Sequence, residues 1–203
     1  MCQSILQSTA FFSFLLGIDQ DLAAEACALG CRCCGGRLHR ACYPRKPRGA
    51  LCPLDPAYRQ RWSFCCARCR RRTTPHSVRF LGRRVYLGVV VTLACAVTTG
   101  LSLRRAGVLT THLHVPLRTL QRWRRWWLVD FVETRFWRGQ QALFMPPVAA
   151  CRLPESLRSR FQSADQSAAW CDLLRFLAPL TSGTANTFGD GRCVHADDAA
   201  SAG

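Results

Sequence analysis

The sequence predicts a mainly α-helical protein that carries one small β module close to its N-terminus. Two Cys-x-x-Cys pairs lie within residues 31–80, a stretch rich in Cys, Arg, Gly and Pro that shows little hydrophobic periodicity. Residues 83–137 place apolar side chains at three- and four-residue spacing, which is typical of amphipathic helices. Hydrophobic residues make up 49% of the 203 positions, which excludes a disordered chain and suffices for a modest core.

Changes in composition divide the chain into segments. The predicted segments are a weakly structured lead-in (1–30), the β module (31–80), a helical region (83–137), a C-terminal helical extension (138–180) and a disordered tail (181–203). In the lead-in, the aromatic and leucine residues from Phe11 to Leu16 predict a short helix that docks on the body, and Asp19–Leu29 predicts another helical turn. Prolines break up the extension but leave one amphipathic stretch, Ala168–Leu177.

The spacing of the cysteines indicates a metal site. Cys31 and Cys34 form one pair, and Cys66 and Cys69 form a second pair that begins 32 positions after Cys34. Two residues between sulfurs allow a tight turn that points both thiolates at one ion, and the glycines at 35 and 36 permit the left-handed backbone of such a turn. Four thiolates without a redox role suit Zn²⁺ best, so the β module is predicted to be a zinc ribbon. Its insert exceeds the usual 15–20 residues or so, which predicts an elaborated hairpin.

Other ligands and other metals remain open at this point. An iron–sulfur cluster would use the same four thiolates. Cys33 and Cys65 adjoin the predicted ligands, and His39, Cys42 and Cys52 lie within reach in the sequence. The 14 cysteines could instead belong to a disulfide scaffold, but their clustering in closely spaced pairs favours metal. A structural site with four protein ligands has no open position for catalysis.

Positive charge is concentrated in the middle of the chain. Between residues 31 and 139 there are 23 basic residues but only three acidic ones, namely Asp55, Asp130 and Glu133. Nearly all the basic residues are arginine, which favours bidentate contact with phosphate and with guanine. The three adjacent residues Arg70, Arg71 and Arg72 are predicted to contact phosphates. This imbalance favours a polyanionic partner, either nucleic acid or an anionic membrane.

A helix-turn-helix is predicted within residues 104–127. Arg104–Gly107 begins a short helix, Thr111–Pro116 forms a turn, and Leu117–Trp127 forms the second helix. Leucine and tryptophan side chains repeat along one face of that second helix. The opposite face is polar and is predicted to meet the major groove of DNA through Arg118, Gln121, Arg122 and Arg125.

The uncharged segment between Val85 and Leu103 has two interpretations. Its 19 residues are long enough to cross a membrane. Threonine and glycine residues within it favour a buried helix, Tyr86–Thr99, that packs against the helix-turn-helix. We expect the buried helix and keep a single membrane span with a cytoplasmic zinc module as the alternative. The N-terminal residues show no basic region of an export signal, so we expect a cytoplasmic protein.

Four blocks of the sequence resemble a known group of proteins. The blocks CGGRLHRACYPRKPRG, SFCCARCRRRTTPHSVRFLGRRVYLG, RTLQRWRRWW and RFWRGQQALFMPP are similar to a bacterial family of small zinc-ribbon/helix-turn-helix proteins of the insertion-sequence, transposase-related type. The resemblance covers roughly residues 31–180 and implies DNA binding linked to a mobile element, with a transposase encoded nearby as a partner. This chain has His114 and Pro116 where the turn of that family usually has Gly and Ser.

No catalytic centre is predicted. A two-metal nuclease or transposase needs about three clustered carboxylates, whereas Asp130 and Glu133 are better interpreted as surface partners of nearby arginines. We therefore expect a non-enzymatic, zinc-binding accessory protein that binds DNA, with RNA as the alternative partner.

Overall fold

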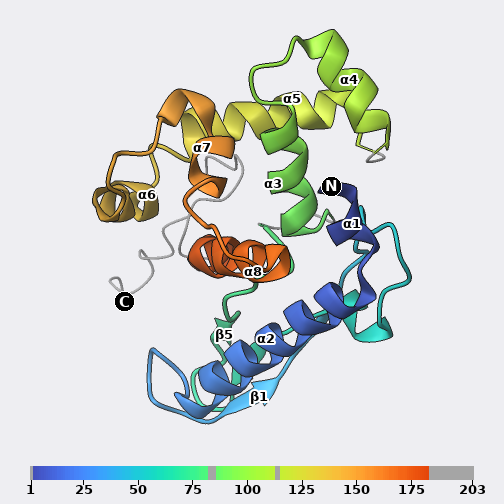
Figure 1. The fold of residues 1–203 in the computed structure, drawn as a ribbon. Helices are drawn as coiled ribbons and strands as arrows, with labels where there is room; N and C mark the ends of the chain where they lie inside the picture. Colours follow the sequence, from blue (N-terminus) through green and yellow to red (C-terminus); the bar gives the residue numbers. More distant parts are fainter. Residues whose placement is uncertain (1, 82–85, 113–114, 183–203) are drawn as a thin grey trace, which may run out of the picture.

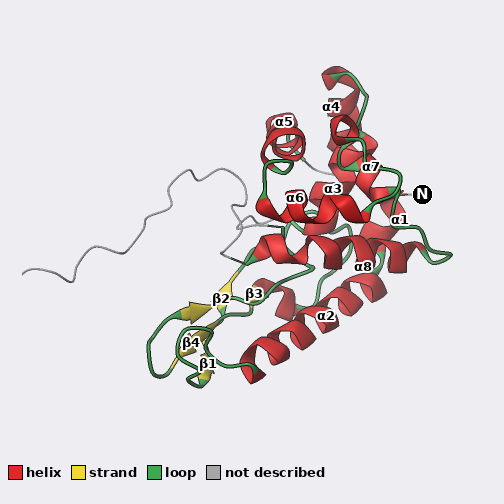
Figure 2. Ribbon diagram, turned by 90° about the vertical axis from the view of Figure 1, so that its left-hand side faces the viewer, coloured by secondary structure: helices red, strands yellow, loops and turns green. Residues whose placement is uncertain are grey.

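The computed structural model describes residues 2–81, 86–112 and 115–182, and its elements are mainly helical. The helices are α1 Cys2–Gln7, α2 Thr9–Ala28, α3 Gly88–Val97, α4 Leu103–His112, α5 Leu117–Arg125, α6 Arg135–Gln140, α7 Glu155–Arg158 and α8 Gln166–Leu177. The strands are β1 Leu38–Arg40, β2 Tyr43–Pro44, β3 Gln60–Arg61, β4 Phe64–Cys66 and β5 Arg72–Thr73. The strands gather at one end of the molecule beside α2, and α4 and α5 lie at the other end (Figures 1 and 2). The predicted disordered tail falls almost wholly on residues 183–203, which lie outside the described residues.

The lead-in is more ordered than the sequence analysis expected. In place of a weakly structured segment with short helical turns, α2 runs unbroken for 20 residues. Ser8 caps its start by accepting a hydrogen bond from the backbone N–H of Phe11 at 3.2 Å. Phe12 and Leu15 are almost fully buried in the main hydrophobic core, because one face of α2 lies along both the β module and the helical body. That burial stabilises a segment for which the local sequence predicted little regular structure.

The predicted buried helix Tyr86–Thr99 is confirmed in slightly shorter form as α3. Each residue from Gly88 to Ala96 is buried. The hydroxyl of Thr92 donates to the carbonyl of Gly88 at 3.0 Å, and that of Thr98 donates to Ala94 at 2.6 Å, so both buried hydroxyls are satisfied within the helix. Within the described part of the chain, no helix has both the length and the apolar character needed to cross a membrane.

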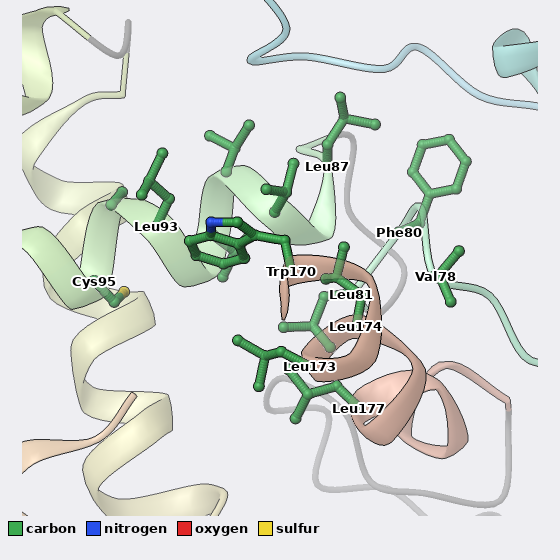
Figure 3. Packing of buried hydrophobic residues seen from close by; sticks show 14 of the residues in the cluster. Val78, Phe80, Leu81, Leu87, Leu93, Cys95, Trp170, Leu173, Leu174 and Leu177 are labelled. Carbon is green, nitrogen blue, oxygen red and sulfur yellow. The ribbon is translucent and has the colours of Figure 1, made fainter. Parts of the chain in front are cut away.

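The second amphipathic prediction, Ala168–Leu177, corresponds to α8. Asp165 caps this helix by accepting from the N–H of Ser167 at 2.8 Å. Figure 3 shows the Trp170 ring of α8 drawn over α3, with Leu173 and Leu174 of the same helix among the buried side chains nearby. These two helices therefore form the centre of the core, onto which the other elements pack.

The helices predicted for the helix-turn-helix are present and contact each other. α4 extends to His112 and is longer than predicted, so the connection to α5 begins later than Thr111. Residues 113–114, including the His114 that departs from the resembling family, lie outside the described residues. α5 packs on both α3 and α4 and continues into one π-helical segment, Trp126–Asp130.

Candidate metal centre

Four sulfur atoms come together where the two Cys-x-x-Cys pairs meet. The Sγ atoms of Cys31, Cys34, Cys66 and Cys69 all lie within 4.8 Å of one another. Two of the separations are 3.5 Å, between Cys31 and Cys69 and between Cys34 and Cys66. A tetrahedral zinc with Zn–S bonds of about 2.3 Å separates its sulfurs by roughly 3.8 Å, so the cluster has the size of a four-thiolate metal site. The predicted ligand set is thus assembled as one group that can hold a metal ion.

The two pairs sit in turns with the same backbone hydrogen bonds. The carbonyl of Cys31 accepts from the N–H of Gly35 at 2.8 Å, and the carbonyl of Cys66 accepts from the N–H of Arg70 at 3.1 Å. The N–H groups of the same two cysteines donate to the carbonyls of Gly36 and Arg71, at 2.9 and 3.0 Å. Gly35 and Arg70 therefore occupy equivalent positions, and their φ angles of 65° and 61° are both left-handed. The predicted left-handed glycine is confirmed at position 35, and Arg70 adopts the same conformation without being glycine.

Gly36 has a steric role, because it lies where the two cysteine turns approach each other, and its backbone is not left-handed. A Cβ atom at this position would lie 3.0 Å from Cys66 Sγ, 3.1 Å from Arg68 Cβ and 3.3 Å from Cys34 Sγ. Contacts this tight would require the neighbouring atoms to move by a few tenths of an ångström, so the absence of a Cβ lets the second turn close against the first without such a shift. The donor set and this fit around it are those of a site shaped for an ion.

Backbone N–H groups favour thiolate at two of the sulfurs. Cys66 Sγ accepts from the N–H of Cys69 at 3.4 Å and from that of Arg68 at 3.3 Å, and these bonds lower the pKa of Cys66 to about 6. The N–H groups of Cys33 and Cys34 lower the pKa of Cys31 in the same way. At Cys69 the N–H of Arg71 acts in that direction too, but burial and the neighbouring sulfurs raise its pKa to about 12. Four thiolates this close repel one another, and a bound cation removes that repulsion.

Short strands and the end of α2 position the two turns. β1 pairs with β4 so that Leu38 is opposite Cys66, and β4 pairs with β5. The long insert continues the hairpin through β2 and β3, which confirms the elaborated hairpin. Gly30, with φ of 71°, ends α2 directly before Cys31. Ala23 of α2 packs against Leu38 and Phe64 beside the cysteines. The module therefore packs on α2. The predicted segment boundary at residue 30 divides α2 from a module with which it shares a small core.

The structure selects among the ligand residues that the sequence left open. Among the residues described, the four predicted cysteines form the one group of three or more metal-ligating side chains close enough to share an ion. Cys33 and His39 are exposed. Cys65 directs its sulfur to the carbonyl of Arg70 at 3.4 Å. Cys42 lies between β1 and β2 and is not part of the group.

The residues predicted to bind nucleic acid form two separate groups. Arg70, Arg71 and Arg72 are exposed on the second cysteine turn and on β5. The side chains of Arg118, Gln121, Arg122 and Arg125 are exposed along α5. In both ribbon views α5 lies at the end of the molecule opposite the strands (Figures 1 and 2). Of the two carboxylates considered for catalysis, Asp130 is exposed and Glu133 pairs with Arg138.

The module holds arginine–aromatic contacts that the sequence analysis did not predict. The guanidinium of Arg40 lies 4.7 Å from the ring centre of Trp62, and those of Arg45 and Arg72 lie 4.9 and 5.8 Å from that of Tyr43. Phe64 is buried as a packing residue, whereas Trp62 is half-buried beneath Arg40. The interleaving of arginine and aromatic residues in the sequence was the signal for these contacts.

No protein-family model, curated protein or solved structure matches this chain. The site is therefore interpreted from its own geometry.

Proposed function

We propose that this chain is a zinc-dependent DNA-binding protein in which α5 reads the major groove. The observation that carries the proposal is the two-sided character of α5. Leu120, Trp123 and the following Trp127 are completely buried, while the predicted arginines and Gln121 are exposed on the other side. A helix fixed by large apolar residues and covered by Arg and Gln outside has the chemistry that contacts guanine and adenine edges.

The helices around α5 support the same proposal. α3 is a rigid, buried base for α5, and Tyr86 packs edge-on against Trp123 with ring centres 5.1 Å apart. α4 packs against α5 after a short connection, which is the order of elements in a helix-turn-helix. We propose that α3, α4 and α5 act as that motif, with α4 crossing the DNA backbone and α5 inserted in the groove.

Electrostatics favour a polyanion at this face. Residues 103–125 contain no Asp or Glu, and Arg104 and Arg105 of α4 are exposed together with the arginines of α5. The ion pairs found among the described residues lie on other elements. A cationic surface without internal neutralisation gains free energy when it displaces the counterions of a duplex.

In this proposal the zinc ion has a structural role. Cys31, Cys34, Cys66 and Cys69 would hold it, and the ion would supply the cross-link that a module with so small a core needs. The module would then present Arg70–Arg72 to phosphates as a second contact with nucleic acid.

The test is the salt dependence of binding to duplexes selected from a random library, measured by fluorescence anisotropy. Arg122→Ala should weaken binding and reduce the slope of log K against log salt concentration by up to about 0.9, because the interface loses one positive charge that displaces counterions from the duplex. Arg135→Ala removes an arginine on α6 that is also exposed and serves as the matched control. Gln121→Ala should relax base preference and leave the slope unchanged. Identical slopes for Arg122→Ala and the native chain would remove α5 from the interface.

Competition with RNA duplexes decides between the two nucleic acids. DNA should displace labelled DNA far better than RNA does, because the deep, narrow major groove of RNA does not admit a helix. We also propose an association with a transposase, and the sequence resemblance alone supports it. Co-purification of the tagged chain with a transposase from the native cell would test it.

A further inference from the structure

We propose that the loop joining β2 to β3 contains a binding site for a nucleoside monophosphate group. Residues between Pro44 and Arg59 line an open surface cavity of about 590 Å³, a volume within the usual 300–1,000 Å³ or so of small-molecule sites. None of the metal ligands, none of Arg70–Arg72 and no residue of α5 lines it. The site therefore belongs to the insert of the zinc module but shares no lining residue with the two groups proposed to contact DNA.

The charges around the cavity favour an anion. Arg45, Lys46 and Arg59 line it, against the single carboxylate of Asp55. Arg45 is held in place by Tyr43, because its guanidinium lies 4.9 Å from the ring centre and donates to the phenol oxygen at 3.4 Å. Three cationic side chains around one hollow match the several oxygens of a phosphate monoester.

The remaining wall favours a ligand that is more than phosphate. Pro44, Pro47 and Leu54 contribute apolar surface that a planar base can cover. Asp55 Oδ1 accepts the N–H of Ala57 at 2.7 Å, which fixes the carboxylate at the start of the 3₁₀ turn Pro56–Arg59. A fixed carboxylate beside a phosphate site can accept hydrogen bonds from ribose hydroxyls.

The loop is preorganised by contacts with three other parts of the fold. The N–H of Arg45 donates to the carbonyl of Arg59 at 2.6 Å and closes the base of the loop. The N–H of Leu51 donates to the carbonyl of Leu6 in α1, and the N–H of Leu87 donates to the carbonyl of Arg48. Gly49, with φ of 101°, lies so close to α3 that a Cβ would be 2.6 Å from Val90. A hollow held in this way loses little conformational entropy when a ligand enters.

The chemistry is shared by a free nucleotide and by the phosphorylated end of a nucleic-acid strand. Calorimetric titration of the zinc-loaded full chain with AMP, adenosine, inorganic phosphate and a 5′-phosphorylated tetranucleotide separates these sources. AMP should bind saturably, and adenosine and phosphate should each bind at least about tenfold more weakly. A tetranucleotide that binds more tightly than AMP would indicate a strand end, and one that binds more weakly a free nucleotide.

Variants of the lining residues show whether the measured heat of AMP binding comes from this cavity. Arg59→Ala and Lys46→Glu change exposed side chains and should each weaken AMP binding by about tenfold or more. Arg37→Ala removes an exposed arginine of the same module that does not line the cavity, and it should leave AMP binding unchanged. Zinc content and thermal midpoint confirm folding of each variant, and Lys46→Glu alone suffices if Arg59→Ala misfolds.

Three results would overturn the proposal. They are the absence of saturable AMP binding at millimolar concentration, equal affinities for AMP and phosphate, and equal losses in Lys46→Glu and Arg37→Ala. The variant Arg122→Ala should bind AMP normally, because its side chain lies on α5. A failure of groove recognition therefore leaves this result untouched, and a failure here leaves the DNA-binding proposal standing.

Discussion

Asp19 Oδ2 accepts a hydrogen bond from Arg79 Nε at 2.7 Å, and both side chains are wholly shielded from solvent. The same carboxylate accepts from the hydroxyl of Ser77 at 2.6 Å and from the N–H of Val78 at 2.7 Å. Arg79 in turn donates to the carbonyl of Gln60 at 3.0 Å. This buried junction ties the middle of α2 to the strands of the module and to the chain segment that enters the helical body.

Replacing Asp19 by Ala should destabilise the whole protein. The substitution leaves the Arg79 guanidinium buried without its carboxylate, which typically costs about 3–5 kcal/mol. Asp172→Ala breaks the pair with Arg175 at 3.6 Å, whose side chains are both more than half exposed, and should cost at most about 1 kcal/mol. Urea unfolding followed by circular dichroism measures both values. Similar losses in the free energy of unfolding for the two variants would show that the buried pair stabilises the fold no more than the exposed pair does.

The same junction marks the limit of sequence-based prediction for this fold. Helical periodicity predicted α5 and α8, because each buries one apolar face that repeats along consecutive residues. An uncharged run predicted α3, whose residues from Gly88 to Ala96 are all buried. The cysteine spacing predicted the metal ligands, because each turn is local and only their pairing is long-range. Nothing in the local sequence indicates that Asp19 pairs with Arg79, which is 60 positions away. The lead-in was therefore predicted to be less ordered than it is. Steric roles such as that of Gly36 likewise arise only when the two turns meet.

Loss of one thiolate should abolish the metal site. Cys66→Ser should reduce bound zinc from one ion per chain to a small fraction and unfold the module, since metal binding supplies its folding free energy. Cys65→Ser is the matched control, because the adjacent sulfur is directed to the carbonyl of Arg70 and not to the cluster. Elemental analysis and the amide spectrum of each variant provide the readout. A Cys66→Ser protein with full zinc content would disprove the ligand assignment.

Gly36→Ala should weaken metal binding without removing a ligand. The new methyl group would meet Cys66 Sγ at 3.0 Å, so one turn must shift, at a typical cost of about 1–3 kcal/mol. Competition with a chromogenic chelator should therefore show zinc affinity lower by about tenfold or more. Gly139→Ala meets no atom within 4 Å and provides the control. Equal zinc affinities in both variants would mean that the turns do not require the close approach.

Thiol reactivity should separate the buried cysteines from the exposed ones. Burial raises the pKa of Cys171 to about 11, so at pH 8 its thiol remains protonated and unreactive in the folded protein. Cys151 is exposed and should be alkylated by iodoacetamide within minutes. Mass spectrometry of the peptides, with and without urea, measures both sites. Rapid labelling of Cys171 in the native protein at pH 8 would contradict its burial in the core.

Arg70→Gly should separate the charge of Arg70 from its effect on the fold. Arg70 adopts the left-handed conformation that glycine adopts at the equivalent position 35, and a side chain there costs about 1–2 kcal/mol. The glycine variant should therefore keep or raise the thermal midpoint of the zinc-loaded protein, whereas Arg70→Ala should not raise it. Both variants lose the same guanidinium, so both should bind duplex DNA more weakly, with the salt slope reduced by about 0.9. A glycine variant that melts earlier than the alanine variant would show that the side chain of Arg70 supports the turn, and an unchanged slope in both would place Arg70 outside the DNA interface.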